Sequence, residues 1–505
     1  MEYLEHVESN AMARPDVHAI VTSSGQCATF EWLWNASEAI ASFIDRHDVP
    51  SGQPIIVYGH KDPRMLACFH GCLKSGHPYV PIDRYSVPDD RARNIASQVN
   101  APFIFAIEEH PFDGCNVVCK QEVDDIIACG GASDRGQWVS GEDVAYIIFT
   151  SGSTGVPKGV QVTSDCFDNF CKWALDLGGV EKTGKVFLNQ APFSFDLSVY
   201  EVAMSLWVGG TLYCLAKETQ EDMKSMMEAL ASSNTAIWVS TPSFADMCLV
   251  NKGFDESLVP SIEMFLFCGE TLTNETVKRL MERFPNAIVM NTYGPTESTV
   301  AVTEVIVSEA MANSPNPIPC GIARPGTRIA ICDADGSELP VGEYGEIVIQ
   351  GDTVALGYYG RPDLTERCFG SSILDGVPVR TYRTGDEGRL DDEGFLHYRG
   401  RLDLQIKLNG FRIELGDIEE NLRKLPGIAS VAVVPAYRNG KIAHLVAHVV
   451  SSNERTESDF REGLKLKAEL ESVLPHYMIP RKFVFHDKLP MTGNGKIDRK
   501  LLAIL

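Results

Sequence analysis

Short apolar runs rich in β-branched and aromatic residues alternate along the chain with stretches of helical periodicity. We expect buried strands at residues 54–58, 145–149, 237–240 and 264–267, and a helix at residues 64–74. This alternation is typical of layered α/β domains, in which ligands bind where strands end and loops begin.

The pattern changes in two places further along the chain. From residue 328 to 359, strand-like runs are separated by Gly and Asp turns, which predicts a β-rich subdomain. Residues 401–505 hold 17 Lys and Arg against 13 Asp and Glu, a net charge of +4, whereas the preceding 400 residues hold 28 against 55, a net charge of −27. This asymmetry predicts a separate basic module on a strongly acidic body.

Composition narrows the class of protein. The 505 residues are 44% hydrophobic and 22% charged, which is typical of a globular chain, and the net charge of −23 argues against nucleic acid as a partner. No apolar run approaches the ~20 residues of a membrane helix, and the first residues lack the pattern of a signal peptide. We therefore expect a cytoplasmic protein with no membrane span, whose fourteen scattered cysteines are free thiols.

The sharpest motif follows the strand predicted at 145–149. Its glycines let the backbone turn tightly and present N–H groups, while hydroxyls and one ammonium add further donors, so a phosphate is the expected guest. The spacing is not that of a Walker loop. The motif reads Thr150-Ser151-Gly152-Ser153-Thr154-Gly155-Val156-Pro157-Lys158-Gly159.

Together with six further segments, this motif resembles the adenylate-forming superfamily, which includes acyl-CoA synthetases, luciferases and the adenylation domains of peptide synthetases. The resemblance spans nearly the whole chain and implies that the protein uses ATP, with Mg²⁺ as the metal cofactor. It also implies an α/β fold with a large N-terminal domain of layered α/β subdomains plus a β-rich subdomain, and a small α+β C-terminal domain on a hinge. The six segments are 73–83 (LKSGHPYVPID), 291–297 (NTYGPTE), 345–359 (GEIVIQGDTVALGYY), 382–386 (YRTGD), 400–419 (GRLDLQIKLNGFRIELGDIE) and 494–499 (NGKIDR).

The resemblance also implies roles for individual residues. Tyr293 offers an aromatic face to adenine, Asp386 accepts from the ribose hydroxyls, and Glu297 supplies a hard oxygen ligand to Mg²⁺. The full set expected to bind the nucleotide is Thr150, Ser151, Gly152, Ser153, Thr154, Gly155, Lys158, Asn291, Thr292, Tyr293, Gly294, Pro295, Thr296, Asp386, Tyr398, Arg401 and Lys496.

Lys496 matches the catalytic lysine of the superfamily. A cation between the substrate carboxylate and the α-phosphate stabilises a transition state in which two anions meet. Asp403 matches the hinge, which divides an adenylation core at 1–402 from a mobile domain at 403–505. The small domain is expected to swing between adenylation and thioester formation.

Asp196 is the residue that indicates an amino acid as substrate. Superfamily members that activate amino acids carry Phe-Asp-x-Ser here, and the aspartate binds the α-ammonium group; the alternative is that Asp196 caps the helix that follows it. The sequences of residues 193–199, 267–270 and 294–303 resemble those of the superfamily branch that activates D-alanine. By this resemblance, Cys268 and Val300 border a methyl-sized pocket. In contrast, the segment Tyr200-Glu201-Val202 is more similar to the Trp-Glu of many peptide-synthetase modules than to the D-alanine branch.

The resemblance therefore implies that D-alanine becomes D-alanyl-AMP, with release of pyrophosphate. The alanyl group then passes to the phosphopantetheine thiol of an acidic carrier protein, supplied in trans, for teichoic acid modification. Candidate docking sites are Arg461, Lys465 and Lys467, or Arg481 and Lys482; the alternative is that these side chains form a solvated helix face. The alternatives are a free-standing peptide-synthetase adenylation domain for another small amino acid, an acyl-CoA synthetase and a non-catalytic nucleotide-binding relative.

Overall fold

The computed structural model describes residues 1–47, 49–152, 156–402, 405–438, 441–452, 458–491 and 497–504. The chain forms two compact units, each described separately below. The first contains Met1–Tyr85, Ala96–Ile148 and Gly159–Leu402, and the second contains Ser86–Ile95, Phe149–Lys158 and the described part of residues 403–505.

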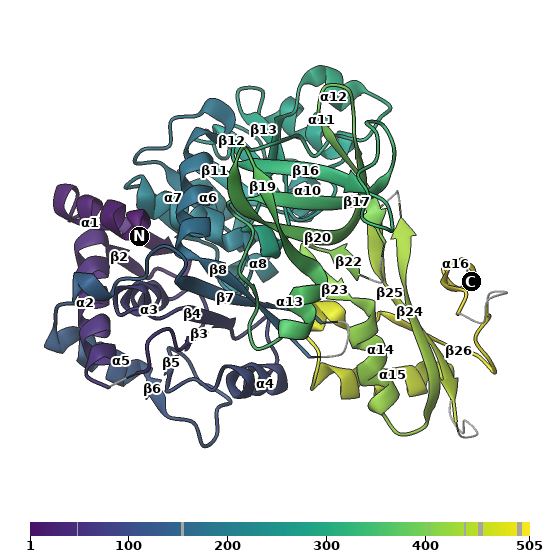
Figure 1. The fold of residues 1–505 in the computed structure, drawn as a ribbon, viewed down its shortest axis with the longest axis horizontal. Coiled ribbons are helices and arrows are strands. Elements are labelled where there is room, and N and C mark those ends of the chain that lie inside the picture. The colour runs from purple at the N-terminus through teal and green to yellow at the C-terminus, as the bar shows by residue number, and fades with distance from the viewer. Residues whose placement is uncertain are drawn as a thin grey trace. The chain divides into compact units, whose positions relative to one another are not determined.

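A nine-stranded sheet carries much of the first unit (Figure 1). Its central strands run parallel, whereas β2, β14 and β15 pair antiparallel at the two edges. In spatial order the strands are β15 (Ile322–Ala323), β14 (Thr303–Ile306), β13 (Ile288–Tyr293), β12 (Met264–Phe267), β11 (Thr235–Ser240), β9 (Val186–Asn189), β10 (Thr211–Cys214), β1 (His18–Thr22) and β2 (Cys27–Thr29).

A seven-stranded sheet is the second layer. Strands β3 to β6 and the β4–β7 pair run parallel, and β18 pairs antiparallel with β8. In spatial order the strands are β18 (Gly357–Tyr358), β8 (Lys158–Thr163), β7 (Val144–Thr150), β4 (Tyr79–Asp83), β3 (Ile55–Gly59), β5 (Ile104–Ala106) and β6 (Val117–Cys119).

Helices connect these strands, and their local sequences explain where they begin. Thr29 caps α2 and Thr163 caps α6 through their side-chain oxygens. Asp62 caps α3 in the same way, and the first residue of that helix is Pro63. The helices are α1 (Glu2–Ala13), α2 (Phe30–Asp45), α3 (Pro63–Lys74), α4 (Asp89–Val99), α5 (Lys120–Cys129), α6 (Ser164–Asp176), α7 (Leu197–Trp207), α8 (Lys217–Glu221), α9 (Met223–Ser232), α10 (Pro242–Val250), α11 (Asn274–Arg283), α12 (Glu309–Asn313) and α13 (Pro362–Cys368).

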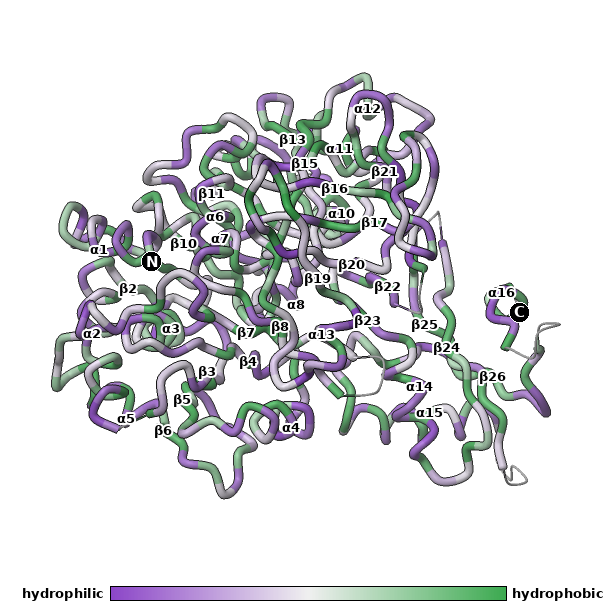
Figure 2. Tube along the Cα trace, viewed as in Figure 1, coloured by the Kyte–Doolittle hydropathy of each residue, from purple (hydrophilic) through white to green (hydrophobic). Residues whose placement is uncertain are grey.

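One continuous apolar core joins the two large sheets of the first unit. It includes buried side chains of α1, α3, α6 and α7 together with strands of both sheets, and α6 packs beside α7 (Figure 1). In Figure 2, α1 alternates between hydrophilic and hydrophobic colours along its turns, as expected for a helix that buries only one face.

The predicted β-rich subdomain is confirmed as an antiparallel sheet. Its order is β16–β17–β20–β19, with β21 paired to β20, and Ile347, Ile349 and Tyr382 lie in its core. The strands are β16 (Thr327–Cys332), β17 (Gly345–Gly351), β19 (Phe369–Leu374), β20 (Val377–Leu390) and β21 (Leu396–Arg401).

The second unit has its own α+β core. Apolar side chains of α14, α15 and β24–β25 pack together, including Ile418, Val433 and Leu470. Its elements after residue 404 are the hairpin β22 (Gln405–Leu408) and β23 (Phe411–Glu414), α14 (Leu415–Lys424), β24 (Ile428–Arg438), β25 (Lys441–Ser451), α15 (Asp459–Glu471), β26 (Lys482–Phe485) and α16 (Arg499–Leu502).

The structure confirms the α/β class and each expected element to within a few residues at its ends. Within the described ranges, no helix is both long and apolar enough to cross a membrane. All fourteen cysteines lie among the described residues as free thiols.

Candidate active site

Asp196 lies at the start of α7, after a segment that leaves the carboxyl end of β9. It occupies the N-cap position, but its side chain makes no capping hydrogen bond, so the helix-cap alternative does not describe it. Instead, the Thr296 hydroxyl donates a hydrogen bond of 2.7 Å to Asp196 Oδ2. The structure therefore brings together two residues that are 100 positions apart and that sequence motifs singled out separately.

Cys268 and Val300, the two residues predicted to border a methyl-sized pocket, lie in contact. The Cys268 thiol is 3.7 Å from the Val300 carbonyl oxygen, and both residues are buried. Thr299 and Val300 have positive φ angles of 60° and 66°. This backbone conformation is strained for β-branched residues, and such strained residues cluster at functional sites. Gly294 permits this geometry, because a Cβ there would be 2.5 Å from the Ala301 Cα.

Tyr293, Asp386 and Arg401 form a hydrogen-bonded group. The Tyr293 hydroxyl donates to Asp386 Oδ2 at 2.6 Å, and Arg401 donates to Asp386 Oδ1 at 2.8 Å. Burial, followed by the nearby Asp386, raises the pKa of Tyr293 well above its usual range, so the phenol remains a donor. The Tyr398 ring centroid is 6.2 Å from that of Tyr293. A carboxylate has about four acceptor positions, so Asp386 keeps capacity beyond these two bonds.

Glu297 is completely buried and accepts a 2.6 Å hydrogen bond from the Tyr358 hydroxyl. The described residues contain no cluster of three or more His, Cys, Asp or Glu side chains that could hold a metal. Mg²⁺ is commonly held by one or two carboxylates together with substrate phosphates and water. A single buried carboxylate therefore suits a metal that enters with a nucleotide. Its partner Tyr358 lies in the 345–359 segment, where the resemblance implied no separate role for it.

The remaining members of the 291–296 segment are fixed by main-chain contacts. Asn291 donates to the Pro319 carbonyl at 2.8 Å, and Thr292 donates to that of Phe267 at 2.9 Å. Pro295 occupies the N-cap position of the short turn that contains Thr296 and Glu297. The Asn291 and Thr292 side chains thus fix the carboxyl end of β13, which leads into this turn.

Except for Gly159, which belongs to the first unit, the described residues of the predicted phosphate loop belong to the second unit. Within that unit, the Ser151 hydroxyl donates to the Arg412 carbonyl at 2.8 Å, and Lys158 Nζ is 3.7 Å from Glu414 Oε1. Thr150 Oγ1 is 3.5 Å from the Lys158 carbonyl oxygen. A side chain at Gly152 would place its Cβ 2.1 Å from the Val156 carbonyl oxygen, so this turn requires glycine.

Five predicted site residues lie outside the described residues: Ser153, Thr154, Gly155, Asp403 and Lys496.

Two family models match the chain. Residues 7–359 match the AMP-binding enzyme family, and residues 417–496 match the AMP-binding enzyme C-terminal domain. The chain belongs to the AMP-binding enzyme family.

Curated relatives of this AMP-binding enzyme cover it almost completely. The chain is 43% identical to the D-alanine–D-alanyl carrier protein ligase of Bacillus cereus strain AH187, over 99% of both chains, and equally similar to that of Bacillus anthracis. Among solved structures, holo-PA1221, an NRPS protein containing adenylation and PCP domains, is 27% identical with a TM-score of 0.85, covering 99% of this chain and 83% of that one.

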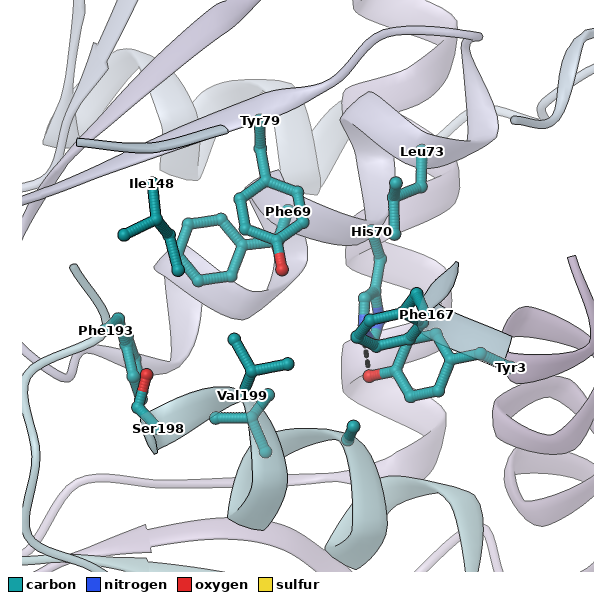
Figure 3. A pocket seen from close by; sticks show the side chains of 12 residues that line it. Tyr3, Phe69, His70, Leu73, Tyr79, Ile148, Phe167, Phe193, Ser198 and Val199 are labelled. Atoms are coloured by element: carbon teal, nitrogen blue, oxygen red, sulfur yellow. Dashed lines mark hydrogen bonds between the residues drawn. The ribbon is translucent and has the colours of Figure 1, made fainter. Parts of the chain in front are cut away.

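A cavity lies beside α7 in this AMP-binding enzyme (Figure 3). It is lined mainly by aromatic and aliphatic side chains of α1, α3, α6 and α7, and the Tyr3 hydroxyl is 2.8 Å from His70 Nε2 at its wall. Burial, followed by Lys74, lowers the pKa of His70 to about 3, so the ring is neutral. No carboxylate lines this cavity, and Asp196 is not part of it.

Sequence motifs also missed a buried polar group beneath the Asp196 segment. Glu201 is completely buried, and burial raises its pKa to about 8; one of its oxygens accepts from the Asn189 amide at 3.0 Å. Lys61 is buried beside the same strand end. Glu201 could have been noticed as a charged residue inside an otherwise apolar run. The sequence does not show, however, which other buried polar group lies near it.

Proposed function

We propose that this chain activates D-alanine with ATP and transfers it to a D-alanyl carrier protein for teichoic acid D-alanylation, in the cytoplasm. The full-length similarity to ligases of that name supports the proposal. The structural observation that carries it is the Asp196 carboxylate, held by Thr296 at the start of α7 rather than used as a cap. A carboxylate in that position suits an ammonium group, which an amino acid has and a fatty acid lacks.

In the first step, a carboxylate oxygen of D-alanine attacks the α-phosphorus of ATP. A C–O–P linkage forms, the bond to the β-phosphate breaks and pyrophosphate leaves. We assign Asp196 to the ammonium group, and Cys268 and Val300 to the methyl group. Because Cys268 and Val300 are buried and in contact, they leave little room for a longer side chain.

For the nucleotide, we assign Tyr293 and Tyr398 to the adenine ring. Asp386 would accept hydrogen bonds from the ribose hydroxyls, and Arg401 would orient its carboxylate. Glu297 would ligate Mg²⁺, which neutralises phosphate charge when bound. Lys496 would bridge the substrate carboxylate and the α-phosphate, where one such contact is worth roughly 3–4 kcal/mol.

In the second step, the phosphopantetheine sulfur attacks the alanyl carbonyl carbon as a thiolate. A C–S bond forms, the C–O bond to AMP breaks and AMP leaves. We propose that residues 403–505 change orientation about Asp403 between the two steps, while residues 1–402 bind ATP and the amino acid.

The basic residues of α15 are the proposed contact for the acidic carrier. Lys465 is 3.6 Å from Glu462 and Lys467 is 3.7 Å from Glu471, so each pairs with a carboxylate of its own helix. Reversing Arg461, Lys465 and Lys467 together to Glu should slow carrier loading and leave pyrophosphate exchange intact. Reversing Arg481 and Lys482 tests the other candidate surface, and unchanged loading in both variants would reject both surfaces.

ATP–pyrophosphate exchange with D-alanine, L-alanine, glycine, serine and a short fatty acid tests the substrate. Exchange confined to D-alanine, followed by loading of a D-alanyl carrier protein, is the expected result. The second candidate is a free-standing peptide-synthetase adenylation domain, which the likeness to the NRPS protein favours. Preference for L-alanine or a larger amino acid would support it, and exchange with the fatty acid alone would exclude both.

A further inference from the structure

Lys61 buries an ammonium group between the two large sheets of the first unit. It follows β3 of the seven-stranded sheet and is only 2% exposed. Its Nζ donates to three main-chain carbonyls of the nine-stranded sheet region, those of Asn189 at 3.1 Å, Gln190 at 2.7 Å and Leu215 at 3.0 Å. Among the described residues, no carboxylate forms an ion pair with it.

This arrangement is unfavourable for folding in two respects. Burial lowers the pKa of Lys61 to about 8, because the charged form loses its hydration. The backbone φ of Lys61 is +49°, a left-handed conformation that is uncommon for residues other than glycine. The buried ammonium group depends on its three hydrogen bonds to offset this cost, and these bonds in turn hold the carbonyls that accept them.

Two of the three carbonyls that Lys61 binds, those of Asn189 and Gln190, lie at the base of the segment that presents Asp196, and the third, that of Leu215, follows β10. Asn189 ends β9, and Gln190 begins the connection to α7. The Asn189 side chain donates to the Ala191 carbonyl and to Glu201 of α7, both at 3.0 Å. The connection is therefore closed at its base by Asn189 and anchored to the other sheet by Lys61.

We propose that Lys61 is a positioning residue for the amino-acid subsite, which fixes the 190–196 segment and hence the location of the Asp196 carboxylate. The proposal rests on the proposed role of Asp196. Because an ammonium–carboxylate contact is made in both the ground state and the transition state, displacement of Asp196 raises the KM for the amino acid more than it lowers kcat.

The chain offers a matched control in Lys182. This lysine is 3% exposed, burial lowers its pKa to about 8, and its Nζ also donates to three carbonyls, those of Leu175, Leu177 and Val180. These carbonyls lie at the end of α6 and in the turn after it, outside the Asp196 segment. Replacement of Lys182 therefore shows how removal of a buried, hydrogen-bonded ammonium group affects stability when the Asp196 segment is left unchanged.

The experiment compares Lys61→Met with Lys182→Met by ATP–pyrophosphate exchange and thermal melting. Methionine keeps the length and apolar bulk of the side chain but cannot donate. In Lys61→Met the Asn189 carbonyl keeps the Leu215 amide as a donor, and the Leu215 carbonyl keeps Gln220, which favours a folded variant.

We expect Lys61→Met to raise the KM for D-alanine by about 10- to 100-fold, because small displacements of a binding group have effects of this order. Its KM for ATP and its kcat at saturating D-alanine should change little. Lys182→Met should lower the melting temperature while leaving both KM values close to wild type. An equal rise in D-alanine KM for the two variants, or an equal rise in both KM values of Lys61→Met, would overturn the proposal.

Asn189→Ala is a second arm that does not alter Lys61. It removes the side chain that closes the segment and should also raise the KM for D-alanine selectively; if neither variant does so, the segment is not positioned in this way. The wild-type protein tests the proposed function independently of these variants, through the amino acid that it activates. If the wild type activates another amino acid, the same selective rise is expected for that amino acid, and if it activates none, both proposals are rejected.

Discussion

Tyr358→Phe tests whether Glu297 is the carboxylate that meets the metal. In the wild type, the Tyr358 hydroxyl donates to Glu297 Oε1 at 2.6 Å, with both side chains buried. Phenylalanine keeps the ring and its edge-on contact with Phe369 at 5.3 Å, so the substitution removes mainly the hydrogen bond.

The magnitude follows from the type of bond. A hydrogen bond to a charged group contributes about 1.5–3 kcal/mol, and its loss leaves Glu297 Oε1 buried without this donor. Removal of the partner that orients a metal-binding carboxylate typically lowers metal affinity about 10- to 100-fold, so the affinity of the site for its cation should fall by a similar factor. The loss should appear as a higher Mg²⁺ requirement, because the tyrosine orients the carboxylate that we assign to the metal.

The assay is a Mg²⁺ titration of ATP–pyrophosphate exchange with saturating D-alanine. Half-maximal exchange should require more Mg²⁺ in Tyr358→Phe, while the KM for D-alanine stays close to wild type. Tyr382→Phe is the control, since the Tyr382 hydroxyl lies 3.4 Å from that of Tyr358 and its loss leaves the bond to Glu297 intact. A wild-type Mg²⁺ titration curve for a folded Tyr358→Phe protein would refute the reasoning.

Three further outcomes are expected. Asp196→Asn should raise the KM for D-alanine by at least about 30-fold, because loss of one partner of a desolvated charge pair costs about 2–5 kcal/mol; an unchanged KM would remove Asp196 from the subsite. Burial raises the pKa of Glu201 from 4.5 to about 8, so the native state retains a proton that the unfolded state releases, and the free energy of unfolding falls as pH rises through this range. Glu201→Gln cannot ionise, so its melting temperature relative to wild type should be higher at pH 8 than at pH 5, and equal differences would contradict the buried, protonated carboxyl. Gly294→Ala should destabilise the protein by about 1–3 kcal/mol, because its Cβ meets the Val300 carbonyl at 2.8 Å, whereas Gly253→Ala, with only an Asn251 side-chain oxygen at 3.4 Å, should melt like wild type.

Residues that belong to a local motif could be predicted from the sequence. The Asp196 and Cys268 segments are recognisable from a few neighbouring residues, and the glycines of the phosphate loop follow from the turn that such a loop requires. Periodicity likewise placed strands such as β12 correctly, since burial on both faces of a parallel sheet selects a continuous apolar run.

The partners of those residues could not be predicted in this way. Tyr358 is 61 residues from Glu297, and Lys61 is 128 residues from Asn189. Tyr358 lies in the 345–359 segment and Lys61 before a helix, but neither local sequence shows which distant residue the side chain meets. Only the packing of separate elements turns them into donors to a buried site.

The sequence by itself determined the fold class, the family resemblance and the residues of the motifs, because these depend on composition and on spacing along the chain. The tertiary structure decided that Asp196 accepts from Thr296 instead of capping α7, and that a lysine from one sheet holds the carbonyls of another. Hydrogen bonds between distant residues depend on where the backbone brings their atoms in space, and no pattern of neighbouring residues contains that distance.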